Sequence, residues 1–427
     1  MALIQATRGT KDILPQEVGY WQLVEQTATE IFSRALYQEI RPPLFEQTSL
    51  FARGIGEGTD VVGKEMYTFV DRGDRSLTLR PEGTAGVVRA LIEHKLYSSG
   101  GVQRLWYKGA MFRYERPQAG RQRQFHQIGL ELLGTQDPRG DVEVIALATD
   151  ILQALGLKNL TLNINSIGNG EDRQNYRQAL IEYLTPYKGE LDPDSQERLE
   201  SNPLRILDSK DKTTQALCQN APNILNYLGD YSQKHFTQVQ KLLTDLGISY
   251  QVNPSLVRGL DYYTHTAFEI QSGDLGAQAT VCGGGRYDGL VTELGGPDTP
   301  AVGWAIGLER LILLLEKMQS PPPLTPDFYL VSKGELAEAQ GLLIAQKLRQ
   351  AGFKVELDLS GSAFAKQMKR ADRSGAIASL VIGEREAASQ TIQLKWMLSQ
   401  AQESFSQSDL LTQITSLAEQ ISRHKNP

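Results

Sequence analysis

Hydrophobic positions along the chain recur at two spacings, which predict helices interspersed with strands. Residues 16–36 carry apolar side chains at the spacing of one helix face, and residues 85–95 and 142–155 also predict helices. Short runs rich in β-branched and aromatic residues predict strands at 61–70, 76–79, 103–115, 125–134, 160–167, 267–270 and 279–282. Residues 303–318 pass from a strand of small residues into an apolar helix.

The second half of the chain shows two changes of character. Residues 170–250 are polar and helical in pattern, which we interpret as an inserted helical region. Residues 320–326 hold four prolines, which predict a stiff linker because proline resists both helix and sheet. Strands expected at 328–331, 355–359, 379–382 and 391–395 then alternate with helices expected at 335–350, 362–373 and 408–423. We therefore expect a domain of residues 1–319, a linker of residues 320–326 and a small α/β domain of residues 327–427.

Composition narrows the class of protein only slightly. The formal net charge of −6 argues against a chain coated in basic charge for indiscriminate nucleic-acid binding, although local basic patches can still bind RNA. No stretch approaches the ~20 apolar residues of a membrane-spanning helix, and the N-terminus has no export signature. The two cysteines, Cys218 and Cys282, make neither a disulfide framework nor a four-cysteine zinc site. These features fit a reducing cytoplasm.

A predicted hairpin carries the strongest chemical signal. Arg113 and Glu115 lie two apart on its first strand, and Phe125, Gln127 and Glu131 share one face of its second strand. Such a face suits a nucleotide, because a guanidinium binds phosphate, an aromatic ring stacks on a base, and a carboxylate binds an amine or a metal. An amphipathic hairpin with salt bridges on its wet face explains any one of these residues better. Only the whole pattern favours a nucleotide site.

That pattern resembles motif 2 of the class II aminoacyl-tRNA synthetases, and the other two motifs of that class follow in order. Residues 37–43, Tyr-Gln-Glu-Ile-Arg-Pro-Pro, resemble motif 1, with Leu36 where a glycine is usual. Residues 303–310, Gly-Trp-Ala-Ile-Gly-Leu-Glu-Arg, resemble motif 3, with alanine in place of its middle glycine. Residues 256–264 and 283–290 are similar to the two histidine-specific boxes of the histidyl-tRNA synthetases. Residues 8–15 and 78–84 also resemble that family.

The resemblance implies a fold and an activity. The fold is an α+β class II catalytic core, an antiparallel sheet flanked by helices with a helical insertion at about 170–250, followed by a C-terminal α/β anticodon-binding domain. The activity is ATP-dependent activation of L-histidine to histidyl-adenylate and its transfer to the 3′ end of tRNA(His), by a cytoplasmic homodimer. Mg²⁺ would bridge the phosphates of ATP, and no protein ligand is assigned to it.

The resemblance also implies roles for residues at matching positions. The catalytic residues are Arg113 and Arg258, and the ATP-binding residues are Arg113, Glu115, Arg121, Phe125 and Arg310. The histidine-binding residues are Glu82, Thr84, Gln127, Glu131, Tyr262, Tyr263 and Tyr287. Contacts to tRNA would come from the hairpin loop, through Arg116 and Arg123, and from one face of a C-terminal helix, through Lys366, Lys369, Arg370 and Arg373. A solvated basic face is the alternative for that helix.

Two rival functions are weighed against this one. Some chains similar to histidyl-tRNA synthetases are non-catalytic regulatory subunits of ATP phosphoribosyltransferase, and these often lose the histidine boxes and the C-terminal domain, both of which are present here. A class II synthetase for threonine, proline or glycine is the second rival, against which the two histidine boxes argue. The segment 387–396 lacks the glycine–threonine pair often found there, so the residues that read the anticodon stay unassigned.

Overall fold

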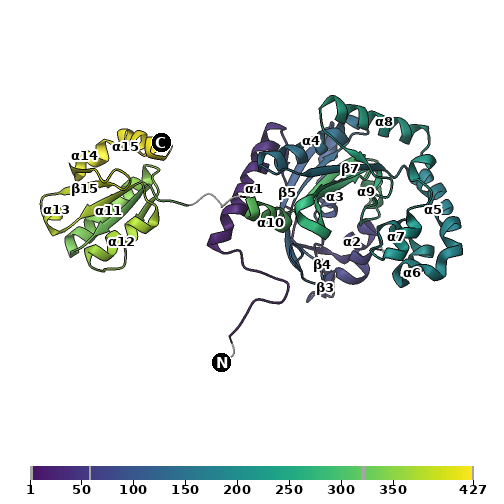
Figure 1. The fold of residues 1–427 in the computed structure, drawn as a ribbon, viewed down its shortest axis with the longest axis horizontal. Helices are drawn as coiled ribbons and strands as arrows, with labels where there is room; N and C mark the ends of the chain where they lie inside the picture. Colours follow the sequence, from purple (N-terminus) through teal and green to yellow (C-terminus); the bar gives the residue numbers. More distant parts are fainter. Residues whose placement is uncertain (1–2, 57–58, 319–323, 426–427) are drawn as a thin grey trace. The chain divides into compact units, whose positions relative to one another are not determined.

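The computed structural model describes residues 3–56, 59–318 and 324–425. The chain divides into two compact units, residues 1–321 and residues 322–427 (Figure 1). The expected linker at 320–326 lies outside the described residues as far as residue 323, and residues 324–326 have no regular secondary structure. Within the described ranges, no helix combines the length and the apolar character needed to cross a membrane.

A sheet of eight strands forms the centre of the first unit, in the order β1-β5-β6-β11-β10-β9-β7-β8. Its strands are β1 (Gln38–Glu39), β5 (Gln103–Phe112), β6 (Gln124–Leu133), β7 (Leu160–Ser166), β8 (Gln251–Val252), β9 (Thr264–Ser272), β10 (Thr280–Arg286) and β11 (Ala301–Gly307). The pairs from β5 through to β7 are antiparallel, whereas β1 and β8 each run parallel to their neighbour. The expected antiparallel sheet is therefore confirmed at its centre and mixed at its edges.

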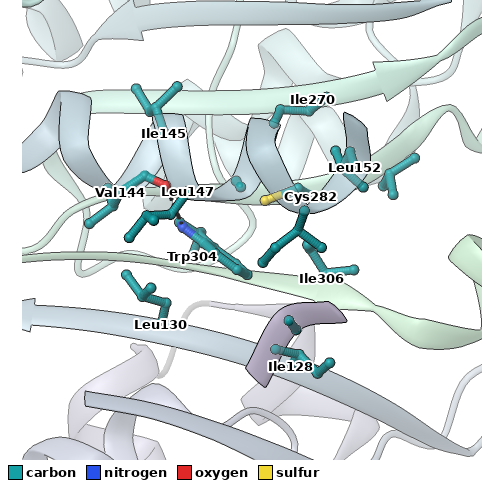
Figure 2. Packing of buried hydrophobic residues seen from close by; sticks show 14 of the residues in the cluster. Ile128, Leu130, Val144, Ile145, Leu147, Leu152, Ile270, Cys282, Trp304 and Ile306 are labelled. Atoms are coloured by element: carbon teal, nitrogen blue, oxygen red, sulfur yellow. Dashed lines mark hydrogen bonds between the residues drawn. The ribbon is translucent and has the colours of Figure 1, made fainter. Parts of the chain in front are cut away.

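One face of this sheet packs against helices and forms the main core. The helices are α1 (Pro15–Arg34), α4 (Pro138–Ala154), α8 (Asp230–Asp245) and α10 (Leu308–Met318). Successive residues of a strand point to opposite faces, so Leu130, Trp304 and Ile306 enter the core while Gly303 and Glu131 point the other way. The indole Nε1 of Trp304 donates to the carbonyl of Val144 at 2.7 Å, which fixes α4 on the sheet (Figure 2).

A smaller sheet of three strands, ordered β2-β4-β3, is formed by the chain between β1 and the hairpin. Its strands are β2 (Phe45–Gln47), β3 (Tyr67–Val70) and β4 (Ser76–Leu79), and the neighbouring helices are α2 (Thr48–Ile55), α3 (Thr84–Glu93) and the short α9 (Leu290–Glu293). The strand expected at 61–70 is wrong for its first half, because Val61–Glu65 forms a π-helical turn. Thr59 accepts from the backbone of Val62 and Gly63, and such local bonds compete with strand pairing.

The insertion is helical, as its polar pattern predicts. It comprises α5 (Gly170–Leu184), α6 (Pro193–Ser201), α7 (Lys212–Cys218) and α8, joined by 3₁₀ turns at Thr185–Glu190, Pro203–Asp208 and Ile224–Tyr227. Asn169 and Asp172 form a reciprocal capping box at the start of α5. Asp192 caps α6 and also accepts from the hydroxyls of Ser209 and Thr214, so one carboxylate joins α6 to the segment leading into α7.

The second unit is a five-stranded sheet in the order β13-β12-β14-β15-β16, with its own hydrophobic core. Its elements are β12 (Phe328–Ser332), α11 (Glu335–Gln350), β13 (Val355–Leu357), α12 (Phe364–Ser374), β14 (Ala378–Ile382), α13 (Glu384–Ala388), β15 (Thr391–Trp396), β16 (Gln402–Ser406), α14 (Gln407–Thr412) and α15 (Ile414–Lys425). The helix expected at 408–423 is broken at Gln413. The sequence did not predict β16, because this edge strand is polar and largely exposed and has no apolar alternation.

Candidate active site

A pocket of about 320 Å³ is lined by β6, β10 and β11, by the hairpin loop, by the start of α3 and by the segment around residue 260. The expected site residues that line it are Glu82, Thr84, Arg113, Glu115, Arg121, Phe125, Gln127, Arg258, Tyr262, Tyr263, Tyr287 and Arg310. These residues come from segments up to 228 positions apart in the sequence, from Glu82 to Arg310. The fold therefore brings the residues of the hairpin, the motif 3 segment and both histidine-specific boxes into one cavity.

Arginines surround one end of the pocket. The Nε of Arg113 donates to the carbonyl of Pro81 at 2.9 Å, and its guanidinium lies 5.4 Å from the centre of the Phe125 ring. Arg310 donates to the carbonyl of Thr280 at 2.9 Å. Burial, followed by the nearby charge of Arg121, lowers the pKa of Arg310 below its ordinary value. This end of the pocket is a concentration of fixed positive charge that suits phosphate groups.

Arg113 and Glu115 both line the pocket, but the prediction that they lie on the first strand of the hairpin is wrong. The strand β5 ends at Phe112, so neither residue lies on it. The backbone N–H of Glu115 instead donates to the carbonyl of Arg113 at 2.8 Å, which makes a tight turn. The Oε2 of Glu115 lies 2.6 Å from the Nε of Arg121, and this ion pair holds the loop of the hairpin over the pocket.

Arg258 is fixed in place from two sides. Its guanidinium forms an ion pair with Glu269 on β9 and lies 5.8 Å from the centre of the Tyr263 ring. A Cβ at Gly283 would overlap the guanidinium, so a side chain at this position of β10 would displace Arg258. Burial alone would lower the pKa of Arg258, but Glu269, Tyr263 and Tyr262 together outweigh burial and raise it. The Nε of Arg258 is buried and has no acceptor within the described ranges.

An acidic recess lies at the other end of the pocket. Glu131 is fully buried, accepts from the hydroxyl of Thr84 at 2.7 Å, and accepts from the hydroxyl of Tyr287. Burial raises the pKa of Glu131 to about 8. Glu82 accepts from the backbone N–H groups of Thr84 and Ala85 at 2.6 and 2.9 Å, and burial raises its pKa as well. Two buried carboxyl groups with raised pKa values are typical of a ligand site.

Aromatic rings close this recess. The rings of Tyr262 and Tyr263 lie 4.7 Å apart, centre to centre, and both line the pocket. The sequence did not predict a third ring, Tyr107 on β5, which is buried with its hydroxyl unbonded to any described residue. A Cβ at either Gly83 or Gly129 would overlap this ring. Gly83 and Gly129 reflect the close approach of Tyr107, but a glycine in a sequence does not identify the side chain that packs against it.

A second residue that the sequence did not predict comes from the insertion. Arg205 lines the pocket, donates to the carbonyl of Gly259 and lies 3.7 Å from the carboxylate of Asp261. The insertion carries no sharp motif, so nothing in the sequence linked Arg205 to the loop beside Arg258. The insertion thus contributes directly to the wall of the pocket.

None of the residues expected to contact tRNA is among those that line the pocket. Arg116 is exposed on the hairpin loop, whereas the guanidinium of Arg123 stacks on Tyr114 with 3.8 Å to the ring centre. Arg370 on α12 is paired with the buried carboxylate of Asp358 at 2.7 Å. Lys366, Lys369 and Arg373 are exposed on the same helix. In the ranges that the structure covers, no group of three or more histidine, cysteine or acidic side chains could hold a metal ion.

Comparison with known proteins identifies relatives over the whole chain. A Histidine–tRNA ligase from Gloeothece citriformis is 75% identical over 425 residues, which cover 100% of this chain and 99% of the relative. A Histidine–tRNA ligase from Microcystis aeruginosa is 72% identical over 426 residues, which cover 100% of both chains. The crystal structure of apo histidyl-tRNA synthetase from S. aureus matches with a TM-score of 0.81 and 39% identity, over 96% of this chain and 100% of that one.

More distant structures share the fold alone. One is a structure from Bacillus halodurans described as an ATP phosphoribosyltransferase regulatory subunit/histidyl-tRNA synthetase, with 22% identity and a TM-score of 0.65 over 90% of this chain and 98% of that one. Two family models match separate parts of the chain. Residues 328–417 match the family described as anticodon binding domain, and residues 9–169 and 190–311 match the family described as histidyl-tRNA synthetase. The chain belongs to the histidyl-tRNA synthetase family of class II aminoacyl-tRNA synthetases and carries an anticodon-binding domain at its C-terminal end.

Proposed function

We propose that the chain activates L-histidine with ATP to form histidyl-adenylate and transfers the histidyl group to the 3′ end of tRNA(His). One observation carries the proposal. A single pocket joins a group of arginines beside the Phe125 side chain to a recess lined by the buried carboxyl group of Glu82, with the carboxyl group of Glu131 bonded to the lining residues Thr84 and Tyr287. The first end suits a nucleoside triphosphate and the second suits a small ligand with an ammonium and a polar ring. Relatives named Histidine–tRNA ligase, 69–75% identical to this chain, support the same activity.

In the first reaction, a carboxylate oxygen of histidine attacks the α-phosphorus of ATP. A new O–P bond forms, the bond from the α-phosphorus to the bridging oxygen breaks, and pyrophosphate leaves with the electron pair. Negative charge gathers on the phosphoryl oxygens, so positioned positive charge lowers the barrier. Arg113 and Arg258 would bind the α-phosphate, Arg310 with Arg121 would bind the γ-phosphate, and Phe125 would stack on adenine.

The recess would recognise histidine by its ammonium and its ring. Glu82, Thr84 and Gln127 would surround the ammonium group, and Tyr262 would line the wall beside them. The phenol of Tyr263 and the carboxyl group of Glu131, which Tyr287 and Thr84 hold in place, would each bond one ring nitrogen. An analogue that lacks a ring nitrogen would leave one of these buried groups unpaired, which is the strongest source of discrimination between similar substrates.

In the second reaction, a ribose hydroxyl of the terminal tRNA nucleotide attacks the carbonyl carbon of the adenylate. A C–O ester bond forms and AMP leaves with the electron pair. Arg116 and Arg123 on the hairpin loop would contact the acceptor end of tRNA. Lys366, Lys369, Arg370 and Arg373 on α12 would contact tRNA through the second unit; Arg370 would do so while paired with Asp358. Deletion of residues 327–427 should therefore lower the rate of tRNA charging far more than that of adenylate formation.

Mg²⁺ would enter the site with ATP. Such an ion is usually held by phosphate oxygens together with one or two carboxylates. Glu65 and Glu115 both line the arginine-rich end of the pocket, and burial followed by the charge of Glu115 raises the pKa of Glu65. Glu65 and Glu115 could supply these carboxylate ligands and would hold the ion. When bound, it would balance the charge of the phosphates.

We propose further that the protein works as a homodimer in the cytoplasm. The small sheet leaves Leu44, Phe45, Phe69 and Val70 exposed, and a cluster of exposed apolar side chains marks an interface. This cluster adjoins residues 37–43, which resemble motif 1. Sedimentation should give a dimer for the intact chain and a monomer for Phe45→Glu. Neither cysteine is in a disulfide in the structure, which fits a reducing compartment.

Amino-acid-dependent exchange of pyrophosphate into ATP, measured with each of the twenty amino acids, tests the proposed activity. Exchange with histidine alone is expected. No exchange with any amino acid from folded protein would refute the proposal and favour a regulatory subunit. Arg258→Ala should lower the exchange rate by orders of magnitude with little change in histidine affinity. Arg104→Ala is the matched control, because Arg104 pairs with Glu143 and does not line the pocket.

A further inference from the structure

A buried ion pair lies directly behind the histidine recess. Asp141 in the first turn of α4 and Arg286 at the end of β10 have side chains that are 0% and 1% exposed. The guanidinium meets both oxygens of the carboxylate, with 3.2 Å from Nε to Oδ1 and a closer contact from Nη2 to Oδ2. Burial alone would raise the pKa of Asp141, but the charge of Arg286 and the neighbouring His235 outweigh burial and lower it. The pair is therefore charged on both sides.

Arg286 also joins the ends of three strands of the site. Its Nη1 donates to the carbonyl of Thr135 at 2.7 Å, four residues after Glu131 on the chain that continues β6. The same nitrogen donates to the carboxylate of Asp288 at 3.1 Å. Asp288 in turn accepts from the backbone N–H of Ala301, the first residue of β11, at 3.0 Å. One guanidinium thus fixes the relative positions of β6, β10 and β11 where they border the recess.

The residue next to Arg286 is part of the recess itself. Tyr287 donates from its hydroxyl to Glu131 and from its backbone N–H to the carbonyl of Ala301, at 2.7 Å in the second case. The pairing of β10 with β9 is irregular between Gly285 and Arg286. Tyr287 lines the pocket, whereas Arg286 does not. Arg286 can therefore act on the ligand only through its neighbours.

The insertion reaches the same aspartate. The Nε2 of His235, on α8, lies 3.3 Å from the Oδ2 of Asp141. The ring of His235 stacks on that of His265 at 5.5 Å, centre to centre. His265 has a φ of +45° and follows Tyr263 by two residues. Asp141 is thus in contact with β10 on one side and, through His235 and His265, with the segment that carries Tyr263 on the other.

We propose that Asp141, Arg286 and His235 are positioning residues that set the geometry of Glu131, Tyr287 and Tyr263, and thereby the affinity and selectivity for the ring of the amino acid. The proposal rests on the proposed role of the recess in binding histidine. A catalytic constellation tolerates only about 0.5 Å of displacement, and supporting residues that never touch the ligand hold it within that range. Asp141, Arg286 and His235 bind none of the groups at the arginine-rich end of the pocket. They therefore affect the affinity for the amino acid and not the affinity for ATP.

The test is pyrophosphate exchange with the full-length chain carrying Asp141→Asn, which keeps the volume of the side chain and removes its charge. We expect the KM for histidine to rise about tenfold, which is a typical effect of replacing a residue that supports a site without touching its ligand. The KM for ATP should stay within about twofold. Discrimination between histidine and thienylalanine, which lacks both ring nitrogens, should fall by a similar factor. His235→Gln is the milder second variant and should shift the same two quantities in the same direction.

A matched control separates positioning from general loss of stability. Asp192 is likewise an aspartate at the start of a helix, α6, and it accepts from Ser195, Ser209 and Thr214 without lining the pocket. Asp192→Asn should lower the melting temperature without changing the KM for histidine. Folded Asp141→Asn and His235→Gln proteins with an unchanged histidine KM, or with equal rises for histidine and ATP, would overturn the proposal. An unchanged histidine KM in Tyr287→Phe would instead refute the assignment of the recess.

Discussion

The buried carboxyl group of Glu131 should make the protein less stable than it would be with an amide at the same position. Glu131 is fully buried, and its only polar contacts in the described residues are with the hydroxyls of Thr84 and Tyr287, both of which donate to it. No guanidinium or ammonium group among those residues pairs with its charge. Glu131→Gln has nearly the same shape and keeps one oxygen that can accept, so the substitution mainly removes the ability to ionise.

The magnitude follows from the two proton affinities of Glu131. Burial raises its pKa from 4.5 to about 8, so the folded state keeps the proton where the unfolded state has released it. The contribution of the protonated group to stability is complete below pH 4.5 and is lost as the pH rises to about 8. At about 1.4 kcal/mol per pH unit, the loss reaches about 5 kcal/mol. That is a large fraction of the roughly 5–15 kcal/mol that typically stabilises a domain.

Urea unfolding of the two proteins between pH 5 and pH 9 measures this loss. Three of the four tryptophans, Trp21, Trp106 and Trp304, report on the first unit. Glu131→Gln should match the unchanged protein near pH 5, exceed its free energy of unfolding increasingly up to pH 8, and then keep a constant advantage. Its exchange activity with histidine should fall at every pH. A difference in stability that does not depend on pH, or greater stability of the unchanged protein at pH 8, would refute the reasoning.

Three further substitutions test other parts of the structure. Gly303→Ala places a Cβ against the carboxylate of Glu131, so it should abolish most exchange activity and lower stability by about 1–3 kcal/mol, measured by urea unfolding. Phe125→Leu should raise the KM for ATP about tenfold and leave that for histidine within twofold, because only the stacking surface is lost. Asp358→Asn should lower the stability of the second unit by about 2 kcal/mol at pH 7. Hydrogen bonds from Ser360 and then Arg370 hold the pKa of Asp358 at about 2 against the effect of burial, so the difference should shrink as the pH falls from 4 toward 2.

The sequence predicts those parts of the site whose residues are adjacent in the chain. The alternation of residues along β6 is enough to place Phe125, Gln127 and Glu131 on one face; Phe125 and Gln127 line the pocket, and Glu131 bonds to its lining residues Thr84 and Tyr287. Strand ends are less predictable, as the turn at Arg113 and Glu115 demonstrates. Strand propensity does not locate the last residue of a strand when the residues that follow are compatible with both a strand and a turn.

The residues that the sequence does not predict are those whose role depends on a partner far along the chain. Tyr107 lies beneath glycines at positions 83 and 129, and Arg205 reaches the loop at 259 from the insertion. Each of these contacts joins segments that carry no common pattern. A glycine signals that some atom approaches closely, but it does not say which atom. Only the folded chain identifies the partner.

The fold by itself would not decide between an enzyme and a regulatory subunit, because a structure described with both names shares it at 22% identity. The decision rests on how particular side chains are held. Arg258 is buried, paired with Glu269 and accommodated by a glycine on β10, which is a costly arrangement for a residue without a chemical role. Glu131 is likewise a buried carboxyl group that no described cation pairs with. The burial of Glu131 opposes stability, and a ligand with a phosphate at one end and a polar ring at the other explains both arrangements.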